Sequence, residues 1–490
     1  MNGKYAAIFS AIGLIAAACA IGSCSSSATS GSPSGGPTPL IGCNPGAQDI
    51  SVASEMLTFG HRVPSRIPPP AYISGKIAVK FTGTGTEPEV GQALARLQAI
   101  QVHPSAASGY AVYAIPESQS PVAAAAQLAG TRGIADAQPL LARYTQNTIP
   151  NDPAFGAAPP YTGPLTTTTQ WDMYYIQMPA TWDSWKGSAS VTIAIIDTGY
   201  DANNVDVCGK VVDSAVFDLG GGAQDKTATA QDMDGHGTNV SGIAASVTNN
   251  ATRFAGVGWD TDLIEVRVFP TPGPGNPTPG SSNLDIAAGI GWAVAHGAKV
   301  INLSLGAPGV CDNAEQNAIN SALGAGVVVV VASGNQGTSS LDVPADCTGT
   351  IAVGASAIDD ITNPAVPTER IASYSNWGSN GDGLTLVAPG GDPSHAQQSC
   401  GVAPLCDYLQ WITNNYSTTA HQFPGTGVLI AGTSQATPHV SGVAALMIAK
   451  NPGVNPATVK QLLQLYADDI GAGVKQGAGR VNAFRTLSHT

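Results

Sequence analysis

Three polar residues, far apart in the sequence, stand in contexts that could support nucleophilic catalysis. Asp197 directly follows an apolar run, Val191–Ile196. His236 lies between two glycines, and Ser434 precedes a run of small residues. A serine hydroxyl is a weak nucleophile unless a base takes its proton, and histidine titrates near neutral pH. Because a carboxylate can orient such a histidine, the three residues together predict an acyl-transfer triad.

Each of these residues has an ordinary alternative when it is considered alone. Asp197 could form a turn, or belong to the Asp-Thr-Gly motif of aspartic peptidases, which need a second such motif that this sequence lacks. His236 could be structural, and Ser434 could simply cap a helix. The surrounding strings, Asp234–Gly242 and Gly432–Ala444, favour the catalytic interpretation.

Residues 151–490 alternate between apolar runs and helical patterns. These segments are the runs Val191–Ile196, Val300–Leu303 and Val327–Ala332, and the helical patterns Leu284–His296 and Ala314–Ala325. Continuous apolar runs are typical of parallel strands that are buried on both faces. We therefore predict an α/β domain, an open parallel sheet flanked by helices. Asp197 is expected at the carboxyl end of a strand, where active sites collect in such sheets.

A smaller α/β pattern occupies residues 75–150. It consists of strands at 76–81, 110–115 and 135–144 and of helices at 89–100 and 121–129. This order predicts a small sandwich of the ferredoxin-like kind. The stretch Thr145–Thr169, rich in Pro, Thr and Gly, separates it from the larger pattern and is an expected site of proteolysis.

The N-terminus has the features of an export signal. Lys4 precedes an apolar run that ends near Ile21, so residues 1–23 are predicted to be a signal peptide. Ile21–Cys24 resembles a bacterial lipobox, in which the cysteine is acylated, although Cys19 or an ordinary cleaved signal are alternatives. Residues 24–74 would then be a tether and linker, because Ser25–Pro39 contains only Ser, Thr, Ala, Gly and Pro. A secreted or cell-envelope location follows, with membrane attachment through Cys24.

Charge and cysteine content restrict the partners of the chain. Its net charge is -13, and residues 151–490 contain 12 Lys/Arg against 27 Asp/Glu, which argues against a nucleic-acid partner. Eight cysteines in an exported chain predict disulfides rather than a metal site. Six remain beyond the signal region, and the favoured pairs are Cys400–Cys406 and Cys311–Cys347.

The strings around the three polar residues, in the order Asp, His, Ser, resemble those of the subtilisin-like (S8) serine peptidases. The resemblance extends from about Asn151 to the C-terminus. It also includes Gln170-Trp171, Ser304-Leu305-Gly306, Ala332-Ser333-Gly334-Asn335 and the segment Gly477–Ala483. The pattern at residues 75–150 is similar to the inhibitory propeptide of these enzymes, and residues 151–490 would be the catalytic domain.

The resemblance implies a role for each matching residue. Ser434 would be the nucleophile, His236 the base and Asp197 the group that orients it. The Asn335 side chain and the Ser434 backbone N–H would bind the oxyanion. Two segments would hold an extended peptide substrate: Ser304, Leu305 and Gly306, and Ala332, Ser333 and Gly334. No cofactor is implied for catalysis.

Some positions depart from the family pattern or leave alternatives open. Asn239 stands where a second histidine is usual, and Gln435 replaces the commoner Met after the serine. Gln170, Asp206 and Asn249-Asn250 lie where the family often binds a structural calcium ion, or they are solvated surface groups. At the floor of the specificity pocket, around Val343–Thr348, Asp346 would either select a basic side chain or face solvent.

We expect a secreted serine endopeptidase that is made as a zymogen and processes itself. Its partners would be polypeptide substrates and its own propeptide. One alternative is a catalytically inactive cell-envelope binding protein on the same fold. Another is a peptidyl transferase, which would resolve the same acyl-enzyme with an amine. Two stretches, Pro270–Asn283 and Gly390–Thr426, are insert-like and are expected to be loops near the cleft.

Overall fold

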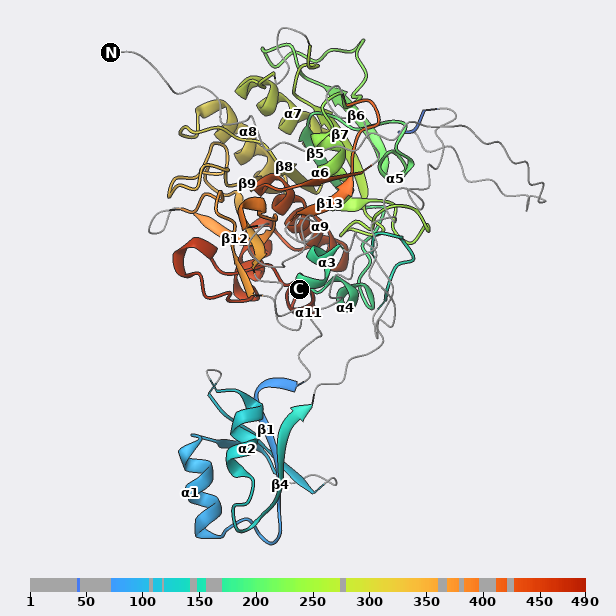
Figure 1. Ribbon diagram of the computed structural model, residues 1–490. Helices are drawn as coiled ribbons and strands as arrows, with labels where there is room; N and C mark the ends of the chain where they lie inside the picture. Colours follow the sequence, from blue (N-terminus) through green and yellow to red (C-terminus); the bar gives the residue numbers. More distant parts are fainter. Residues whose placement is uncertain are drawn as a thin grey trace, which may run out of the picture. The chain divides into compact units, whose positions relative to one another are not determined.

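The structure is a computed structural model, shown in Figure 1. It describes residues 42–44, 72–104, 109–116, 119–141, 148–155, 170–273, 279–359, 368–378, 383–395, 411–420 and 427–490. None of the helices within these ranges combines the length and the apolar character needed to cross a membrane. The predicted pair Cys400–Cys406 lies outside the described residues, as does Cys24.

Residues 72–141 form an antiparallel sheet with two helices. The elements are β1 (Tyr72–Phe81), α1 (Pro88–Arg96), β2 (Ile100–His103), β3 (Tyr110–Ala114), α2 (Pro121–Leu128) and β4 (Ile134–Leu141). The strands lie in the order β2-β3-β1-β4. Ile77 and Val79 of β1 pack with Val90 of α1 and Leu128 of α2 in a core of their own.

The strand β2 was not expected from the sequence. We predicted a helix over 89–100, but α1 ends at Arg96 and Ile100 begins the strand. Gln98 has a left-handed backbone (φ 50°), the conformation that commonly follows the last turn of a helix. Ile100 is 70% exposed, so its apolar character does not mark the buried face of either element.

An eight-stranded sheet organises the larger domain. Its strands are β5 (Thr192–Asp197), β6 (Val211–Val216), β7 (Asp262–Arg267), β8 (Val300–Leu303), β9 (Val328–Ala332), β10 (Ile351–Asp359), β11 (Thr368–Ile371) and β12 (Leu384–Pro389). The order is β11-β10-β9-β8-β5-β7-β6, and β12 pairs with β10. All pairs are parallel except β10 with β11. A separate antiparallel pair, β13 (Ile412–Asn415) and β14 (Gly427–Ile430), completes the strands of this domain.

Helices cover both faces of this sheet (Figure 1). They are α3 (Trp171–Tyr175), α4 (Met178–Trp182), α5 (Val205–Cys208), α6 (His236–Ala245), α7 (Asn283–Ala295), α8 (Asn313–Gly324), α9 (Thr433–Lys450), α10 (Pro456–Leu465) and α11 (Ala483–Ser488). Alternate residues of β5 pack on opposite faces of the sheet. Ile193 and Ile195 share a core with α6 and α9, whereas Ala194 and Ile196 share one with α7 and α8. This double burial explains why the apolar runs of the sequence are continuous.

Two disulfides join distant parts of the chain. Cys311–Cys347 is present, as predicted. The second links Cys43 to Cys208 across 165 residues, a pairing that the sequence left open. Cys208 is the last residue of α5, so the short segment 42–44 is attached to the large domain.

Candidate active site

Asp197 and His236 meet at the carboxyl edge of the sheet. Asp197 ends β5, and His236 begins α6. The Nδ1 atom of His236 lies 2.7 Å from Oδ1 of Asp197, which also accepts a hydrogen bond from the Thr198 backbone N–H at 2.7 Å. The carboxylate is buried, whereas the imidazole is 25% exposed. The carboxylate therefore fixes the imidazole while leaving part of the ring accessible.

A buried aspartate that sequence analysis missed holds this region together. Asp232 accepts hydrogen bonds at Oδ1 from Gly235 N at 2.8 Å and from Thr198 Oγ1 at 2.9 Å. Its Oδ2 atom accepts from Thr238 N at 2.9 Å. Asp232 thus ties the loop before α6 to the loop after β5. Its place two residues before the Asp-Gly-His string was the only signal in the sequence.

Burial and nearby carboxylates act in opposite directions on the pKa of His236. Burial lowers the pKa of the imidazole, but the charge and hydrogen bond of Asp197, together with Asp234 and Asp232, more than reverse that effect. The net result raises the pKa of His236 to about 9. A proton that reaches this ring is therefore held firmly, which suits the imidazolium formed during acyl transfer.

Ser434 lies in the first turn of α9 and exchanges hydrogen bonds with Ser304. The Ser434 hydroxyl donates to the Ser304 backbone oxygen at 3.0 Å, and the Ser304 hydroxyl donates to the Ser434 backbone oxygen at 2.8 Å. The hydroxyl is thus directed to Ser304 rather than to His236, which differs from the expected triad. Hydroxyl groups rotate to suit their partners, and catalytic hydrogen bonds are often loose before substrate binds.

Two hydrogen-bond donors converge near Gly432. The Asn335 Oδ1 atom accepts from the backbone N–H and the hydroxyl of Thr433, both at 2.9 Å, so the amide nitrogen is left to donate elsewhere. A Cβ atom placed on Gly432 would lie 3.7 Å from Asn335 Nδ2 and 3.6 Å from Ser434 N. Both donors therefore border one small space beside Gly432, which Gln435 Oε1, 2.8 Å from the same Cβ position, also borders. A developing oxyanion could be bound there.

The two predicted peptide-binding segments lie on neighbouring strands. Ser304, Leu305 and Gly306 follow β8, and Ala332, Ser333 and Gly334 lie at the end of β9. The loop 342–343 connects them: Asp342 N donates to Ser333 O at 2.9 Å, and Val343 N donates to Ala307 O at 2.9 Å. The six residues predicted from the sequence are thus brought together at one edge of the sheet.

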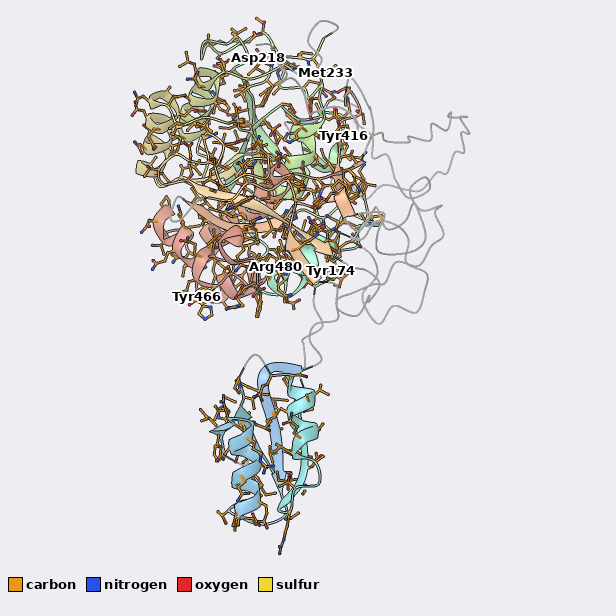
Figure 2. The ribbon with its side chains drawn as sticks, turned by 60° about the vertical axis from the view of Figure 1, so that its left-hand side comes forward. Tyr174, Asp218, Met233, Tyr416, Tyr466 and Arg480 are labelled. Carbon is orange, nitrogen blue, oxygen red and sulfur yellow. A yellow bond between two sulfur atoms is a disulfide. The ribbon has the colours of Figure 1, made fainter. Side chains whose placement is uncertain are left out.

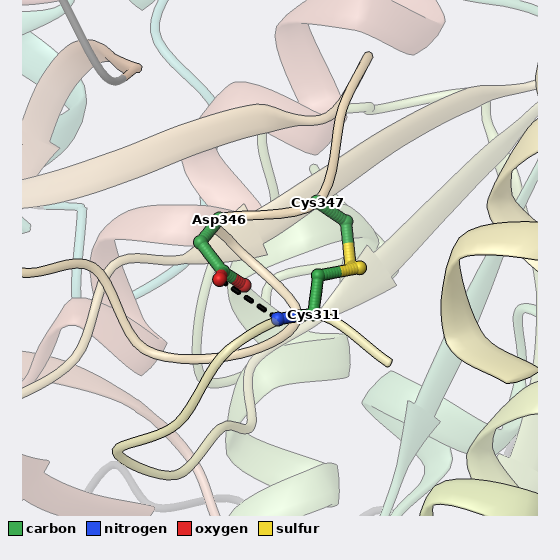
Figure 3. Close-up of side chains that lie close together, drawn as sticks. All are labelled: Cys311, Asp346 and Cys347. Carbon is green, nitrogen blue, oxygen red and sulfur yellow. Dashed lines mark hydrogen bonds between the residues drawn. A yellow bond between two sulfur atoms is a disulfide. The ribbon is translucent and has the colours of Figure 1, made fainter. Parts of the chain in front are cut away.

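Asp346 does not lie between these segments. Figure 3 shows it beside the Cys311–Cys347 disulfide, where Asp346 Oδ2 accepts from the Cys311 backbone N–H at 2.8 Å. Both sulfur atoms are in the disulfide and are not available as thiolate ligands for a metal. Asp346 is therefore part of the loop's own structure, and the acidic residue between the two segments is Asp342.

The two departures from the family pattern contact each other. Gln435 Nε2 donates to Asn239 Oδ1 at 3.1 Å, and Asn239 Nδ2 donates to the Asn415 backbone oxygen at 3.1 Å. Gln435 follows Ser434 on α9, and Asn239 lies three residues after His236 on α6. This buried bridge therefore links the helices that carry Ser434 and His236.

Tyr416 packs against the turn at Asp234 and Gly235, directly before His236. Its hydroxyl donates to the Asp234 backbone oxygen at 2.8 Å. A Cβ atom on Gly235 would lie 2.2 Å from the Tyr416 ring, and this glycine has φ 105°. Glycine is required here both by the backbone conformation and by the close ring. Tyr416 is labelled in Figure 2.

The candidate calcium ligands are satisfied within the protein. Gln170 pairs with both backbone groups of Ala255, at 2.9 Å and 2.8 Å. Asp206 Oδ1 accepts from Asn250 Nδ2 at 2.8 Å. The guanidinium of Arg253, a side chain only 1% exposed, hydrogen-bonds to Asn204 and attracts the Asp206 carboxylate. Because a protein cation already lies among these oxygens, the residues do not fit a calcium ion here.

Comparisons with known proteins identify the family of this chain. The sequence profile of the Subtilase family, Peptidase_S8, matches residues 188–481. The chain is 34% identical to thermitase from Thermoactinomyces vulgaris over 341 residues, which cover 69% of this chain and 99% of thermitase. It is 34% identical to subtilisin Savinase from Lederbergia lenta over 316 residues, covering 64% and 96%.

A comparison with solved structures identifies the same family. A protease from Pseudoalteromonas arctica superimposes with a TM-score of 0.55 and 28% identity, covering 70% of this chain and 99% of that protein. The family profile covers more than half of the 490 residues. The chain therefore belongs to the subtilase family and is a subtilisin-like serine endopeptidase.

Proposed function

We propose that Asp197, His236 and Ser434 form the catalytic triad of this endopeptidase. The observation that carries the proposal is the 2.7 Å bond between Asp197 and His236, at the same strand edge where Ser434 and Asn335 present their donors. In this assignment the Asn335 amide and the Ser434 backbone N–H bind the oxyanion. Peptidases of this family need no catalytic cofactor.

The reaction follows from these positions. With substrate bound, the Ser434 hydroxyl turns from Ser304 toward His236 and attacks the scissile carbonyl carbon. His236 takes the hydroxyl proton and passes it to the leaving amine, while Asp197 holds the imidazole and its cation. Water, activated by His236, then attacks the acyl-enzyme, and Ser434 leaves with its proton restored. The oxyanion donors act in both halves because each passes through a tetrahedral intermediate.

The extended substrate would lie between Ser304–Gly306 and Ala332–Gly334. Both segments follow neighbouring parallel strands, and a peptide that lies beside them in an extended conformation would continue the sheet. Polypeptides are therefore the proposed substrates. We assign residues 75–150 to an inhibitory propeptide and residues 1–23 to a signal peptide, which makes the protein an exported zymogen.

Labelling with a fluorophosphonate probe tests the triad. The wild-type protein should be labelled at Ser434, as located by mass spectrometry of the modified peptide, and should hydrolyse casein. His236→Ala should lose both properties, because the serine then has no base. A protein that neither reacts with the probe nor cuts casein would support the alternative of an inactive binding protein of the cell envelope.

A lipid anchor at Cys24 is part of the same proposal. Its basis is the lipobox-like Ile21–Cys24 and the small-residue tether behind it. Mass spectrometry of the mature N-terminus distinguishes an acylated cysteine from an ordinary cleaved signal.

A further inference from the structure

Asp342 lies between the two segments that are proposed to hold the substrate. Its backbone N–H bonds to Ser333, and the next residue pairs with Ala307. A Cβ atom on Gly334 would lie 2.6 Å from Asp342 Oδ2, and one on Gly306 would lie 3.2 Å from Asp342 Cβ. The carboxylate thus occupies the space that the absent side chain of Gly334 leaves open.

This carboxylate has polar partners but no counter-ion. Gln336 Nε2 donates to Oδ2 at 3.1 Å, and Asn376 Nδ2 donates to Oδ1 at 3.3 Å. Asp342 is 4% exposed, and it takes part in no ion pair with any residue that the structure describes. Burial and the nearby Asp346 raise the pKa of the Asp342 carboxyl. A buried acid surrounded only by neutral donors is stabilised when a cation reaches it.

We propose that Asp342 forms the floor of the primary specificity pocket and selects substrates with arginine or lysine before the scissile bond. This inference rests on the proposed substrate-binding role of Ser304–Gly306 and Ala332–Gly334. The incoming cation pairs with the carboxylate and displaces or joins the amide of Gln336, an exposed residue. A guanidinium is the better match, since it can bond to a carboxylate through two N–H groups.

Peptide nitroanilides that differ only in the residue before the cut test this assignment. Wild-type kcat/KM should be higher for arginine than for phenylalanine, and Asp342→Asn should lower that ratio by about 10- to 100-fold, as expected for loss of a hydrogen bond to a charged group. Asp346→Asn is the matched control, because Asp346 bonds to Cys311 N, and it should leave the ratio unchanged.

The outcomes separate this inference from the proposed function. A wild type that prefers phenylalanine, with a ratio unaffected by Asp342→Asn, would overturn the role of Asp342 while leaving the triad intact. If Asp346→Asn rather than Asp342→Asn lowered the arginine-to-phenylalanine ratio of kcat/KM, Asp346 would be the residue that selects the substrate. Failure of every substrate, together with no fluorophosphonate labelling, would overturn the triad.

A second inference comes from the Cys43–Cys208 disulfide. Residues 75–150, the assigned propeptide, lie between these two cysteines in the chain. Segment 42–44 is also held by non-covalent contacts: Asn44 N donates to Ala202 O at 3.0 Å, and Asn44 Nδ2 to Asn203 Oδ1 at 2.6 Å. A Cβ atom on Gly42 would lie 2.5 Å from Val211 Cβ. The segment is therefore closely packed on the large domain.

We infer that a single cut between the propeptide and the catalytic domain does not separate residues 42–44 from the catalytic domain. After cleavage within Thr145–Thr169, the upstream chain stays attached through Cys43–Cys208. A second cut, between Cys43 and Gly75, is needed to release the propeptide. A lipid on Cys24 would then continue to anchor the mature enzyme. This inference rests on the proposed processing.

Electrophoresis with and without reductant tests it. After cleavage, the peptide containing Cys43 should stay with the catalytic domain without reductant and separate when reductant is added. Cys43→Ser should separate in both conditions, whereas Cys311→Ser with Cys347→Ser should behave as wild type. If the protein does not process itself, a recognition site for a specific protease can be introduced within 156–169. Cleavage with that protease then allows the same comparison. Separation of the wild-type fragments without reductant would overturn the inference.

Discussion

Charge around His236 determines the pH at which this side chain can act as a base. Only the neutral imidazole accepts the serine proton, so a pKa raised by Asp197, Asp234 and Asp232 moves activity toward alkaline pH. Asp197 contacts the ring directly, whereas Asp234 acts through its charge and through a 3.2 Å bond to the His236 backbone N–H. The two carboxylates can therefore be distinguished experimentally.

Asp234→Asn should shift the acidic limb of the kcat/KM profile to lower pH. Removing a negative charge makes the imidazolium less stable, lowers the pKa of His236 and allows the neutral base to exist at a lower pH. The measurement is kcat/KM on a peptide amide between pH 5 and about 10. Asp225→Asn, on an exposed turn, is the control and should not move the limb. A shift to higher pH in Asp234→Asn would contradict the assigned direction.

Asn335→Ala should reduce turnover far more than substrate affinity. The amide is fixed through its oxygen by Thr433, so its N–H groups meet the carbonyl oxygen as negative charge develops there. We expect kcat to fall by about 10²–10³, a range taken from the corresponding loss in a subtilisin. Steady-state kinetics on a peptide amide measures it, with Asn320→Ala on α8 as control. An increase confined to KM would make Asn335 a binding residue.

The residues that sequence analysis found and those that it missed differ in a physical way. Asp197, His236 and Asn335 stand in local strings whose spacing predicts the roles proposed for them. Asp342 and Asp232 act through contacts between segments far apart in the chain, such as the bond from Thr198 to Asp232. Local patterns carry no information about such contacts, and Asp346 was therefore considered in place of Asp342.

Helices α6 and α9 carry His236 and Ser434, the proposed base and nucleophile. The Gln435–Asn239 hydrogen bond joins them immediately behind both residues, in a buried position. A side-chain bridge of this kind positions catalytic groups without touching the substrate.

Asn239→Ala and Gln435→Ala should each lower kcat, and their effects should not add. Either change removes the same bridge, so the double variant should resemble the more damaged single variant, with a coupling of about 0.5–3 kcal/mol. KM should stay nearly constant, because neither residue lies in the peptide-binding segments. Gln435→Glu, which keeps the shape but removes the amide donor, should resemble Gln435→Ala. Additive losses would show that the bridge does not position the helices.

Arg253 is expected to replace a structural cation in the loop that follows α6. It has a left-handed backbone (φ 35°), which a non-glycine residue adopts only when its surroundings enforce it. Arg253→Met removes the buried guanidinium that hydrogen-bonds to Asn204 and attracts the Asp206 carboxylate, and it should lower the free energy of unfolding more than loss of an exposed arginine does.

Denaturant unfolding in an inactive Ser434→Ala background measures this cost without self-digestion. The half-exposed Arg485 pairs with Asp468, so Arg485→Met is the control and should cost less than about 1 kcal/mol. Chelation should change the stability of the parent and of its Asp206→Asn derivative equally. Calcium stabilisation that Asp206→Asn abolishes would show that the ion binds here after all.

The sequence predicted elements best where both faces of a strand are buried. Val300–Leu303 was located to the residue, and β5 and β9 to within one residue, because their apolar runs have sharp ends. The exposed strand β2 has no such signal, since its place depends on pairing with β3. The disulfide partner of Cys208 was also undetermined, because 165 residues separate it from Cys43.

At the scale of the whole molecule, the chain consists of two folded units with separate cores. Ile77 and Leu128 belong to the core of the small unit, whereas the cores of the large domain contain residues from Phe155 onward. Residues 151–155 already belong to the large domain: Asp152 accepts from Asn249 N at 2.8 Å, and Ala154 N donates to Arg253 O at 3.0 Å. A cut after these residues would remove part of that packing, whereas a cut before them would preserve it.

Ser434→Ala should therefore accumulate as a full-length precursor, with residues 75–150 still joined to the large domain. The cut within Thr145–Thr169 requires the nucleophile if the enzyme processes itself. Alanine deletes one hydroxyl whose hydrogen bond goes to Ser304, so the fold should be retained at a cost of about 0.5–1.5 kcal/mol, the net contribution of a typical hydrogen bond. Reducing electrophoresis and N-terminal mass spectrometry of purified protein measure the outcome. Ser441→Ala, a buried serine further along α9, is the control and should still be processed. Identical mature N-termini in Ser434→Ala and wild type, with no other protease present, would exclude self-processing and assign the cut to a second enzyme.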